Sequence, residues 1–423
     1  MQERVSRILS PCGWCQKFSA NAVVHSLRLA CSVSLDGEGD ALTEVASVGL
    51  TGVPAAAQRL QGAIRLASRG LVEREVLVEL IALSAVAEEH LLVIGEPGTA
   101  KSEAVRRVAR ALGGQYFEYL LGRFTEPSEL FGPIDLLKLQ QGQLVTVTTG
   151  MLPEADVAFL DEVFLGSTAI LNTLLGLLNE RQFRRGATSV RVPLRVCVGA
   201  SNALPEEPAL AAFADRFLAR VFVTSVPDSE LETLLTLGLQ PAPMGTPASL
   251  EDLALLTTAR RAVDLSPVLP SIASAIRQLR RAGIALTDRR VVRAQSLVAA
   301  ATTLGGRGVA TPADLWPIIY AVPTLAEQES ARDVLRELLT SSESSLSAAA
   351  LDASSGPQAR AVRIGEAAEA LLTGGPDSEG LAAWRLRIEG LLREIDATFS
   401  ATALPEPITT LRGRLVIELG NAT

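Results

Sequence analysis

The sequence is poor in several residue types, and each shortage disfavours a class of protein. Only two of its 423 residues are histidines, His25 and His90, and neither stands in a catalytic motif, which disfavours Ser/His, Cys/His and HExxH chemistry. Four cysteines in so long a chain predict no disulfide framework, so a reducing cytoplasm is the expected location. No apolar run reaches the ~18 residues of a membrane span, and the N-terminus is a poor signal peptide.

Aromatic residues and lysines are also scarce. Aromatic residues make up 4% of the chain, so its cores must be built mainly from Leu, Val, Ala and Ile. Only three of the 39 basic residues are lysines, namely Lys17, Lys101 and Lys138. The net charge of −8 disfavours a dedicated nucleic-acid or membrane-surface protein, although a local basic patch is compatible with it.

The first segment, residues 1–55, is rich in Ser and Gly and shows no sustained helical or strand period, so we expect a poorly ordered extension. It holds three of the four cysteines. A zinc site is one interpretation of these residues, but the irregular spacing favours incidental cysteines; the candidate ligands are Cys12, Cys15, His25 and Cys31.

The remaining chain divides by pattern. Residues 56–227 alternate short apolar strands with helices, which predicts an α/β domain with a parallel, doubly wound sheet. Within it, GQLVTVTTG and FRRGATSVRVP are expected as β-hairpins. Residues 228–340 carry only helical patterns and predict an all-α lid. Residues 341–358 have the composition of a linker, and 359–423 predict two helices with a short apolar segment, RGRLVIEL.

The strongest motif follows the apolar strand HLLVIG and precedes a helix. It fits GxxxxGK[ST] except that Ala100 replaces the second glycine; its residues are Gly95, Glu96, Pro97, Gly98, Thr99, Ala100, Lys101 and Ser102. Such a loop surrounds phosphates with backbone N–H groups at the positive N-terminus of a helix. Lys101 is expected to contact the β- and γ-phosphates of ATP, Ser102 to bind Mg²⁺, and Ala100 to have a negative φ.

A second motif, VAFLDE, ends a buried strand in Asp161 and Glu162, 60 residues after Lys101. Two solvated acids at an ordinary strand end would look the same in isolation. Paired with the upstream loop, Asp161 is expected to hold Mg²⁺ through water and Glu162 to polarise the attacking water.

Three weaker candidates follow in order. Asn202 ends the strand LRVCVGASN and can orient the lytic water. The helical pattern PALAAFADRFLAR carries Arg216, which can reach a neighbouring subunit's γ-phosphate, with Arg220 one helical turn later as the alternative. An intrachain salt bridge is the competing explanation for Arg216.

The segment LTDRRV lies in the predicted lid. Thr287 or Asp288 can cap a helix whose first turn carries Arg289 and Arg290. Arg289 is expected to point back to the nucleotide, with Arg290 as the alternative, while a surface basic pair would look similar.

In this order the motifs resemble Walker A, Walker B, sensor 1, the arginine finger and sensor 2 of AAA+ ATPases. GEPGTAKS, LLNERQF, LTDRRV and the segment between the Walker motifs are similar to the MoxR family, with its RavA-like branch nearest. The resemblance covers roughly 56–322. It implies a hexameric ring that hydrolyses ATP with Mg²⁺ and acts as a chaperone-like motor on a protein client, often with a von Willebrand factor A domain partner.

Two other functions remain open from sequence: a nucleotide-gated scaffold with little turnover, and a DNA-acting AAA+ motor. Glu162 and Arg216 disfavour the scaffold. The acidic balance and the lack of an appended DNA-binding motif disfavour the DNA motor.

Replacing Lys101 with Ala tests the phosphate-binding loop. We expect Lys101→Ala to abolish nucleotide binding, because the β- and γ-phosphates lose their only nearby lysine. The measurement is a titration with a fluorescent ATP analogue. Unchanged affinity would remove the Walker A assignment.

Overall fold

The computed structural model describes residues 52–227, 230–237, 248–339, 346–375, 381–398 and 406–421. Nearly all of the expected extension 1–55, and the four candidate zinc ligands within it, therefore lie outside the described residues. By their contacts, the described residues from Gly52 onward belong to one unit. None of the described helices is long and apolar enough to cross a membrane.

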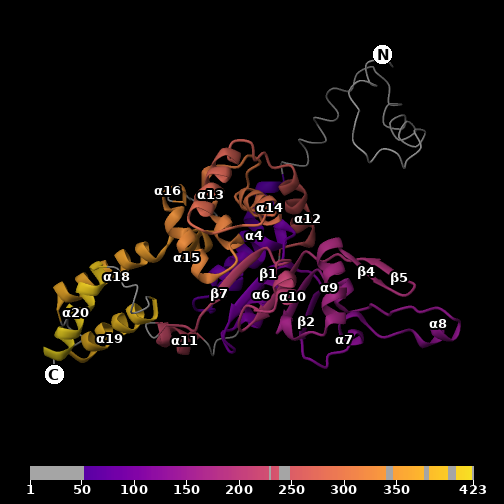
Figure 1. Ribbon diagram of the computed structural model, residues 1–423, viewed down its shortest axis with the longest axis horizontal. Helices are drawn as coiled ribbons and strands as arrows, with labels where there is room; N and C mark the ends of the chain where they lie inside the picture. The colour runs from indigo at the N-terminus through magenta and orange to yellow at the C-terminus, as the bar shows by residue number, and fades with distance from the viewer. Residues whose placement is uncertain are drawn as a thin grey trace, which may run out of the picture. The chain divides into compact units, whose positions relative to one another are not determined.

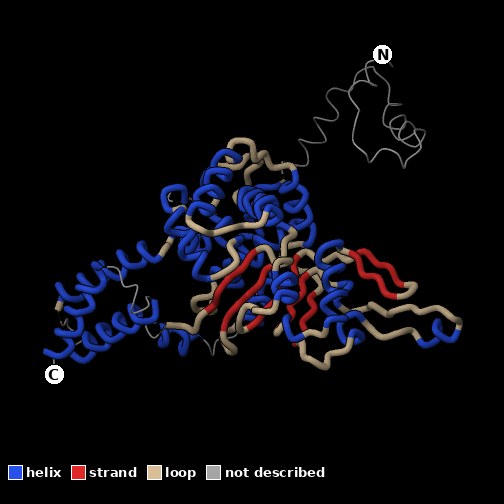
Figure 2. Tube along the Cα trace, in the orientation of Figure 1, coloured by secondary structure: helices blue, strands red, loops and turns tan. Residues whose placement is uncertain are grey.

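A parallel sheet of five strands forms the centre of the α/β region. The strands are β1 (Leu91–Gly95), β2 (Tyr116–Leu120), β3 (Val157–Asp161), β6 (Val196–Ser201) and β7 (Ala219–Val223). They lie in the order β2-β3-β6-β1-β7, and every neighbouring pair is parallel (Figure 2). The three inner strands are apolar runs, as expected where helices cover both faces of a sheet. The predicted doubly wound α/β fold is confirmed.

Alternate residues of each strand enter two different cores. On β1, Leu91 and Val93 face a core shared with helices α5 (Glu75–Ala87) and α6 (Lys101–Leu112). Leu92 and Ile94 face the opposite core, which contains side chains of α9 (Thr168–Glu180) and α10 (Pro208–Ala214). The period of two along the strands therefore fixes which helices cover which face.

The region after the sheet is helical, as predicted for a lid (Figure 1). Its described helices are α11 (Leu231–Leu237), α12 (Leu250–Arg261), α13 (Leu269–Arg281), α14 (Asp288–Leu304), η5 (Pro312–Asp314), η6 (Trp316–Ala321), α15 (Leu325–Val334) and α16 (Arg336–Leu339). Helices α12 and α14 pack on α5 and on the first described helix, α4 (Val53–Ser68). Arg59 of α4 binds Asp252 of α12 through two hydrogen bonds, so chain segments far apart in sequence are joined here.

The linker expected at 341–358 was wrong over most of its described part, because Ser347–Ser354 form helix α17. Ala349, Ala350 and Ala353 are buried, and α17 packs on α5 and η6. The segment is rich in Ser, but its alanines recur at helical spacing and make a narrow apolar face, which composition alone conceals.

Buried polar groups hold α17 in place. The Glu79 carboxylate on α5 accepts hydrogen bonds from the backbone N–H of Ala349 at 2.7 Å and of Ala348 at 3.4 Å, at the N-terminus of α17. Burial raises the pKa of Glu79. Near the other end, Arg332 donates to the Asp352 carboxylate at 2.7 Å and to its carbonyl at 3.0 Å.

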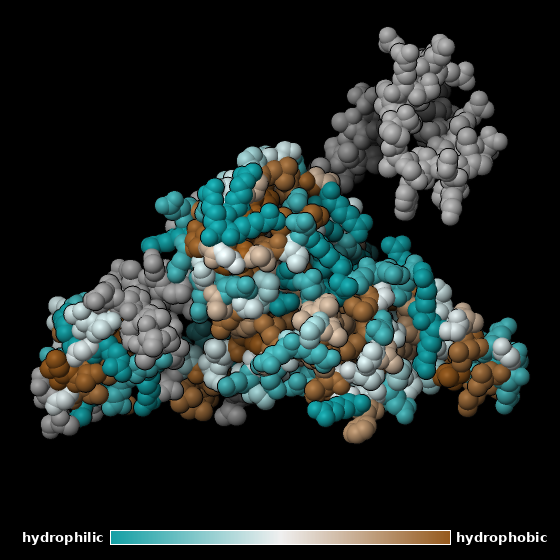
Figure 3. Space-filling view, in the orientation of Figure 1, coloured by the Kyte–Doolittle hydropathy of each residue, from teal (hydrophilic) through white to brown (hydrophobic). Residues whose placement is uncertain are grey.

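Two hairpin-like segments lie side by side. The expected hairpin FRRGATSVRVP is confirmed as β4 (Gln182–Arg185) and β5 (Thr188–Arg191). GQLVTVTTG does not form a hairpin by itself; its residues pair with 133–135 across the short helix α8 (Leu136–Gln140). Thr146 and Thr188 join the two segments at 2.7 Å. Three leucines of α8 are exposed, namely Leu136, Leu137 and Leu139. Figure 3 shows apolar surface in the region where Figure 1 labels α8.

The C-terminal region contains three helices rather than the expected two with an apolar segment. They are α18 (Pro357–Gly374), α19 (Leu381–Thr398) and α20 (Glu406–Asn421), and RGRLVIEL lies within α20. Their buried side chains form a small core of their own around Ile388 and Leu415. Val416 and Ile417 of this stretch are exposed on α20, so its apolar composition does not mark a separate segment.

Removing the Arg332 guanidinium should test whether α17 belongs to the folded core. Arg332 is 4% exposed, so Arg332→Met removes a buried guanidinium and its hydrogen bonds to Asp352, and it should lower the free energy of unfolding by about 3 kcal/mol. Urea unfolding followed by circular dichroism measures this. Arg59→Met is the control: it removes a more exposed ion pair and should lower the free energy of unfolding by a smaller amount. An equal, small loss in both variants would mean that α17 contributes little.

Candidate nucleotide-binding and hydrolysis site

The phosphate-binding loop joins β1 to α6 at the carboxyl edge of the sheet. Gly95 ends the strand and Lys101 begins the helix, so the loop's N–H groups lie at the positive helix N-terminus. A Cβ on Gly95 would lie 2.3 Å from the Val223 carbonyl oxygen of β7. Only glycine therefore fits where the loop leaves the sheet.

The expectation of a negative φ at Ala100 was wrong. Ala100 has φ 59° and ψ 25°, in the left-handed region, and Gly98 also has a positive φ of 82°. The chain must turn sharply here to enter α6, which is where the motif's second glycine normally stands. An alanine in this conformation costs about 1–2 kcal/mol relative to the right-handed region. The loop thus stores strain at a predicted functional position.

Lys101 lies inside this loop. Its Nζ donates to the carbonyl oxygens of Gly95 at 2.6 Å and of Glu96 at 2.9 Å. Burial lowers the pKa of Lys101, while the charges of Asp161 and Glu162 oppose that shift. The ammonium is thus held where two carboxylates and the loop's N–H groups face the same space.

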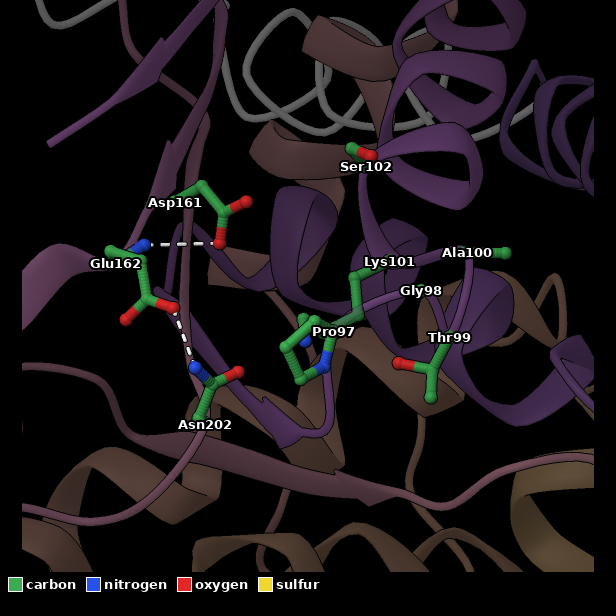
Figure 4. A pocket seen from close by; sticks show the side chains of 9 residues that line it. All are labelled: Pro97, Gly98, Thr99, Ala100, Lys101, Ser102, Asp161, Glu162 and Asn202. Carbon is green, nitrogen blue, oxygen red and sulfur yellow. Dashed lines mark hydrogen bonds between the residues drawn. The ribbon is translucent and has the colours of Figure 1, made fainter.

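The acids and the amide come together at the same edge, as Figure 4 shows. Asp161 ends β3, and its carboxylate accepts the backbone N–H of Glu162 at 3.0 Å. Glu162 has φ 49°, a second left-handed residue, which turns the chain out of the strand. Asn202 follows the neighbouring strand β6, and its Nδ2 donates to Glu162 Oε1 at 2.7 Å. One hydrogen bond thus links the expected base to the expected sensor.

These groups line one cleft of about 300 Å³. Its lining residues are Pro97, Gly98, Thr99, Ala100, Lys101, Ser102, Asp161, Glu162 and Asn202. Backbone N–H groups and an ammonium suit a polyphosphate, and a hydroxyl with a carboxylate supplies the oxygen ligands that Mg²⁺ prefers. The chemistry of the donors therefore fits ATP and Mg²⁺.

The structure does not bring Arg216 to this cleft. Arg216 precedes β7, whose first residue Ala219 pairs with Leu91, whereas the loop begins at Gly95. Those four residue steps along β1 span about 13 Å at ~3.3 Å per residue. Arg216 therefore lies beyond the amino edge of the sheet, opposite its own subunit's cleft.

Arg289 also lies at this opposite edge, which corrects the expectation that it points to its own subunit's nucleotide. It is exposed, and its Nη2 donates to Asn179 Oδ1 near the end of α9 at 3.0 Å. Burial and the nearby charge of Arg216 lower its pKa. Helix α14 begins on this side of the molecule because it packs along α5, whose end leads into β1.

Arg220 and Arg290, the two alternative arginines, are both interior. The helical pattern of PALAAFADRFLAR runs to Arg220, but α10 ends at Ala214. Arg220 lies on β7 and is 6% exposed, and its guanidinium donates to the Pro323 carbonyl at 2.9 Å. Burial lowers the pKa of Arg220 to about 10. Arg290 is 1% exposed. Neither can extend to a neighbouring subunit without leaving the core.

Sequence reasoning missed Arg74. This buried arginine precedes α5 and donates to the Thr99 carbonyl at 2.8 Å and to the Thr224 carbonyl at 2.7 Å, which joins the phosphate-binding loop to the end of β7. Burial lowers its pKa. In the sequence it stands between two glutamates, where a solvated charge cluster is the natural interpretation.

The comparison with known proteins concerns the part of the chain that contains the cleft residues. Residues 58–254 match the family model described as the MoxR domain in the MoxR-vWA-beta-propeller ternary systems. This part of the chain is therefore similar to the MoxR domain. The RavA-like branch stays a prediction.

Two uncharacterized proteins of Methanocaldococcus jannaschii are each 37% identical over 246 residues, which is 58% of this chain and 66% or 64% of theirs. The chaperone MoxR1 of Mycobacterium tuberculosis is 27% identical over 198 residues, 46% of this chain and 52% of that protein. The matches thus span less than two thirds of each relative's length.

A solved structure from Cytophaga hutchinsonii, described as an ATPase candidate, is similar in fold. It has a TM-score of 0.56 and 17% sequence identity, and the match covers 71% of this chain and 99% of that one. At this identity the likeness concerns the fold alone.

Replacing Glu162 with Gln separates binding from chemistry. We expect Glu162→Gln to keep ATP affinity and to lose turnover by about 100-fold or more, because the base is removed while Asp161 remains. A coupled phosphate-release assay and a binding titration measure the two properties. Turnover within a few-fold of the parent protein would mean that another group activates the water.

Proposed function

We propose that this chain is a Mg²⁺-dependent ATPase of the MoxR type that assembles into a ring, expected to be a hexamer, and remodels a protein partner. The observation that carries the proposal is that the predicted site residues lie in two groups at opposite edges of the sheet. Lys101, Glu162 and Asn202 meet in one cleft, while Arg216 and Arg289 lie together at the opposite edge of the sheet.

Each cleft residue has a task that its contacts support. The loop N–H groups and Lys101 bind the β- and γ-phosphates, and Ser102 and Asp161 would hold Mg²⁺. When bound, the ion supplies charge stabilisation between the phosphate oxygens. Glu162 accepts a proton from the attacking water, and Asn202 fixes the orientation of that carboxylate.

The two outer arginines are suited to act across a subunit interface. Arg216 has a buried Nε without a hydrogen-bond partner. The competing intrachain salt bridge is disfavoured, because the adjacent Asp215 carboxylate binds Arg290 at 2.8 Å instead. The like charges of Arg216 and Arg289 repel each other. An anionic triphosphate of a neighbouring subunit would relieve that repulsion.

The proposed partner follows from the matching family model and from exposed apolar side chains. The matching family model is described from systems that also contain vWA and beta-propeller components, so a partner with a von Willebrand factor A domain is expected. Exposed leucines of α8 offer apolar surface for a protein client. A cytoplasmic location is part of the same proposal.

The other two functions receive less support. A scaffold without turnover has no need of the strained Glu162 held by Asn202. For a DNA-acting motor, the exposed Arg184 and Arg191 of the β4–β5 hairpin are the relevant basic groups, but the chain's net charge of −8 opposes it.

Mixing two inactive proteins tests the placement of Arg216. Arg216→Ala and Lys101→Ala should each lose nearly all turnover, and mixed rings should recover part of it. Some interfaces would then combine an intact loop from one subunit with an intact arginine from the next, and such an arginine is worth ~10³-fold or more. Phosphate release is measured across mixing ratios. No recovery despite proven co-assembly would contradict the trans arginine.

A further inference from the structure

We infer that Arg290 and Arg293, on lid helix α14, are positioning residues. They hold residues 215–218, called here the Arg216 loop, in the geometry needed by the neighbouring subunit. This inference rests on the proposed role of Arg216 and deepens it. It concerns residues that do not line the subunit's own cleft.

The Arg290 guanidinium is buried against the loop itself. It donates to the Asp215 carboxylate at 2.8 Å, to the Leu218 carbonyl at 2.5 Å and to the Phe217 carbonyl at 3.4 Å. Its Nε donates to the Ala321 carbonyl at 2.9 Å. Three of the four acceptors therefore belong to residues 215–218, on both sides of Arg216.

Arg293 lies one turn further along α14 and holds the same loop at its centre. Its Nη2 donates to the carbonyl oxygen of Arg216 at 3.2 Å. The same guanidinium binds the carboxylate of Glu89, with Nε to Oε2 at 3.0 Å. Glu89 is 7% exposed and directly precedes the segment that leads into β1, so Arg293 joins the loop to both the lid and the sheet.

Apolar packing anchors the end of the loop, because Phe217 and Leu218 are fully buried, while its carbonyl groups accept hydrogen bonds from α14. Residues 215–218 lie between α10 and β7, outside any regular element. Backbone hydrogen bonds from Arg216 to Phe213 and from Phe217 to Ala214 continue the helix only briefly. A rigid guanidinium that binds several carbonyls at once can define such a loop, whereas a flexible ammonium cannot.

The arrangement has a mechanical consequence. Hydrogen bonds join the Arg216 loop to α14, so a shift of α14 relative to the sheet would disturb the loop. A change in lid position in one subunit therefore changes what that subunit presents to its neighbour. Because a misplacement of about 1 Å at a reacting centre can cost ~100-fold in rate, loss of the hydrogen bonds alone is enough to lower turnover.

Arg290→Met tests the role of the buried guanidinium, and Arg332→Met is the matched control. Both remove a buried arginine from the helical region, but Arg332 binds Asp352 rather than the Arg216 loop. We expect Arg290→Met rings to bind ATP within about twofold of the parent and to lose at least about tenfold in turnover. Arg332→Met should keep its turnover per folded protein.

Complementation distinguishes positioning from a general structural role. Arg290→Met should recover turnover when mixed with Lys101→Ala, whose arginine loop is intact. It should not recover when mixed with Arg216→Ala, because both proteins then lack a competent arginine loop. A variant that is merely unstable would not show this pattern, in which turnover recovers with Lys101→Ala but not with Arg216→Ala.

Three results would overturn the inference: parental turnover of Arg290→Met while Arg216→Ala is inactive, recovery with Arg216→Ala, or no recovery with Lys101→Ala despite co-assembly. If Arg290→Met does not fold, Arg293→Gln, which alters a less buried side chain, is mixed in the same way and decides. An active Arg216→Ala would instead contradict the proposed function, so the two failures are distinguishable.

Discussion

The parallel direction of the five strands governs where every group of this site lies. Because β1, β3 and β6 point the same way, their carboxyl ends place Gly95, Asp161 and Asn202 at one edge. The same direction puts the residues that precede strands at the other edge. Glu89 and Arg216 are found there, separated from the cleft by the length of β1. One topological constraint thus assembles the candidate nucleotide cleft and places Arg216 on the opposite side of the sheet.

Local strain marks the cleft. Ala100 and Glu162 both have left-handed backbone angles, and both are located where a strand or loop must turn abruptly toward the nucleotide side. Such conformations persist only where surrounding structure fixes them. For Glu162 the Asn202 amide and the adjacent Asp161 carboxylate provide that support. The strain is offset by the packed sheet on which both turns stand.

Arginine and lysine have different tasks in this lysine-poor chain. Arg74 and Arg290 are buried, and each binds backbone carbonyls of irregular segments with its planar guanidinium, while the buried Arg332 binds a carbonyl of helix α17. Lys101 instead places a compact ammonium between two carbonyls of a tight loop. A guanidinium spans and fixes a loop, whereas an ammonium fits where a phosphate must also approach. This contrast offers a physical reason why a chain with few lysines has one in the phosphate-binding loop.

The sequence by itself determined the strands, the phosphate-binding loop and the acids that follow β3, because each rests on a contiguous pattern with a distinct period. It did not determine α17, whose alanine face is hidden by serines, or the end of α10, where Phe213 and Phe217 continue a helical spacing into a loop. Only the tertiary structure decided that Asn202 meets Glu162, that Arg220 is interior and that Arg290 binds the Arg216 loop. Those facts depend on contacts between segments 40 or more residues apart, which no local pattern encodes.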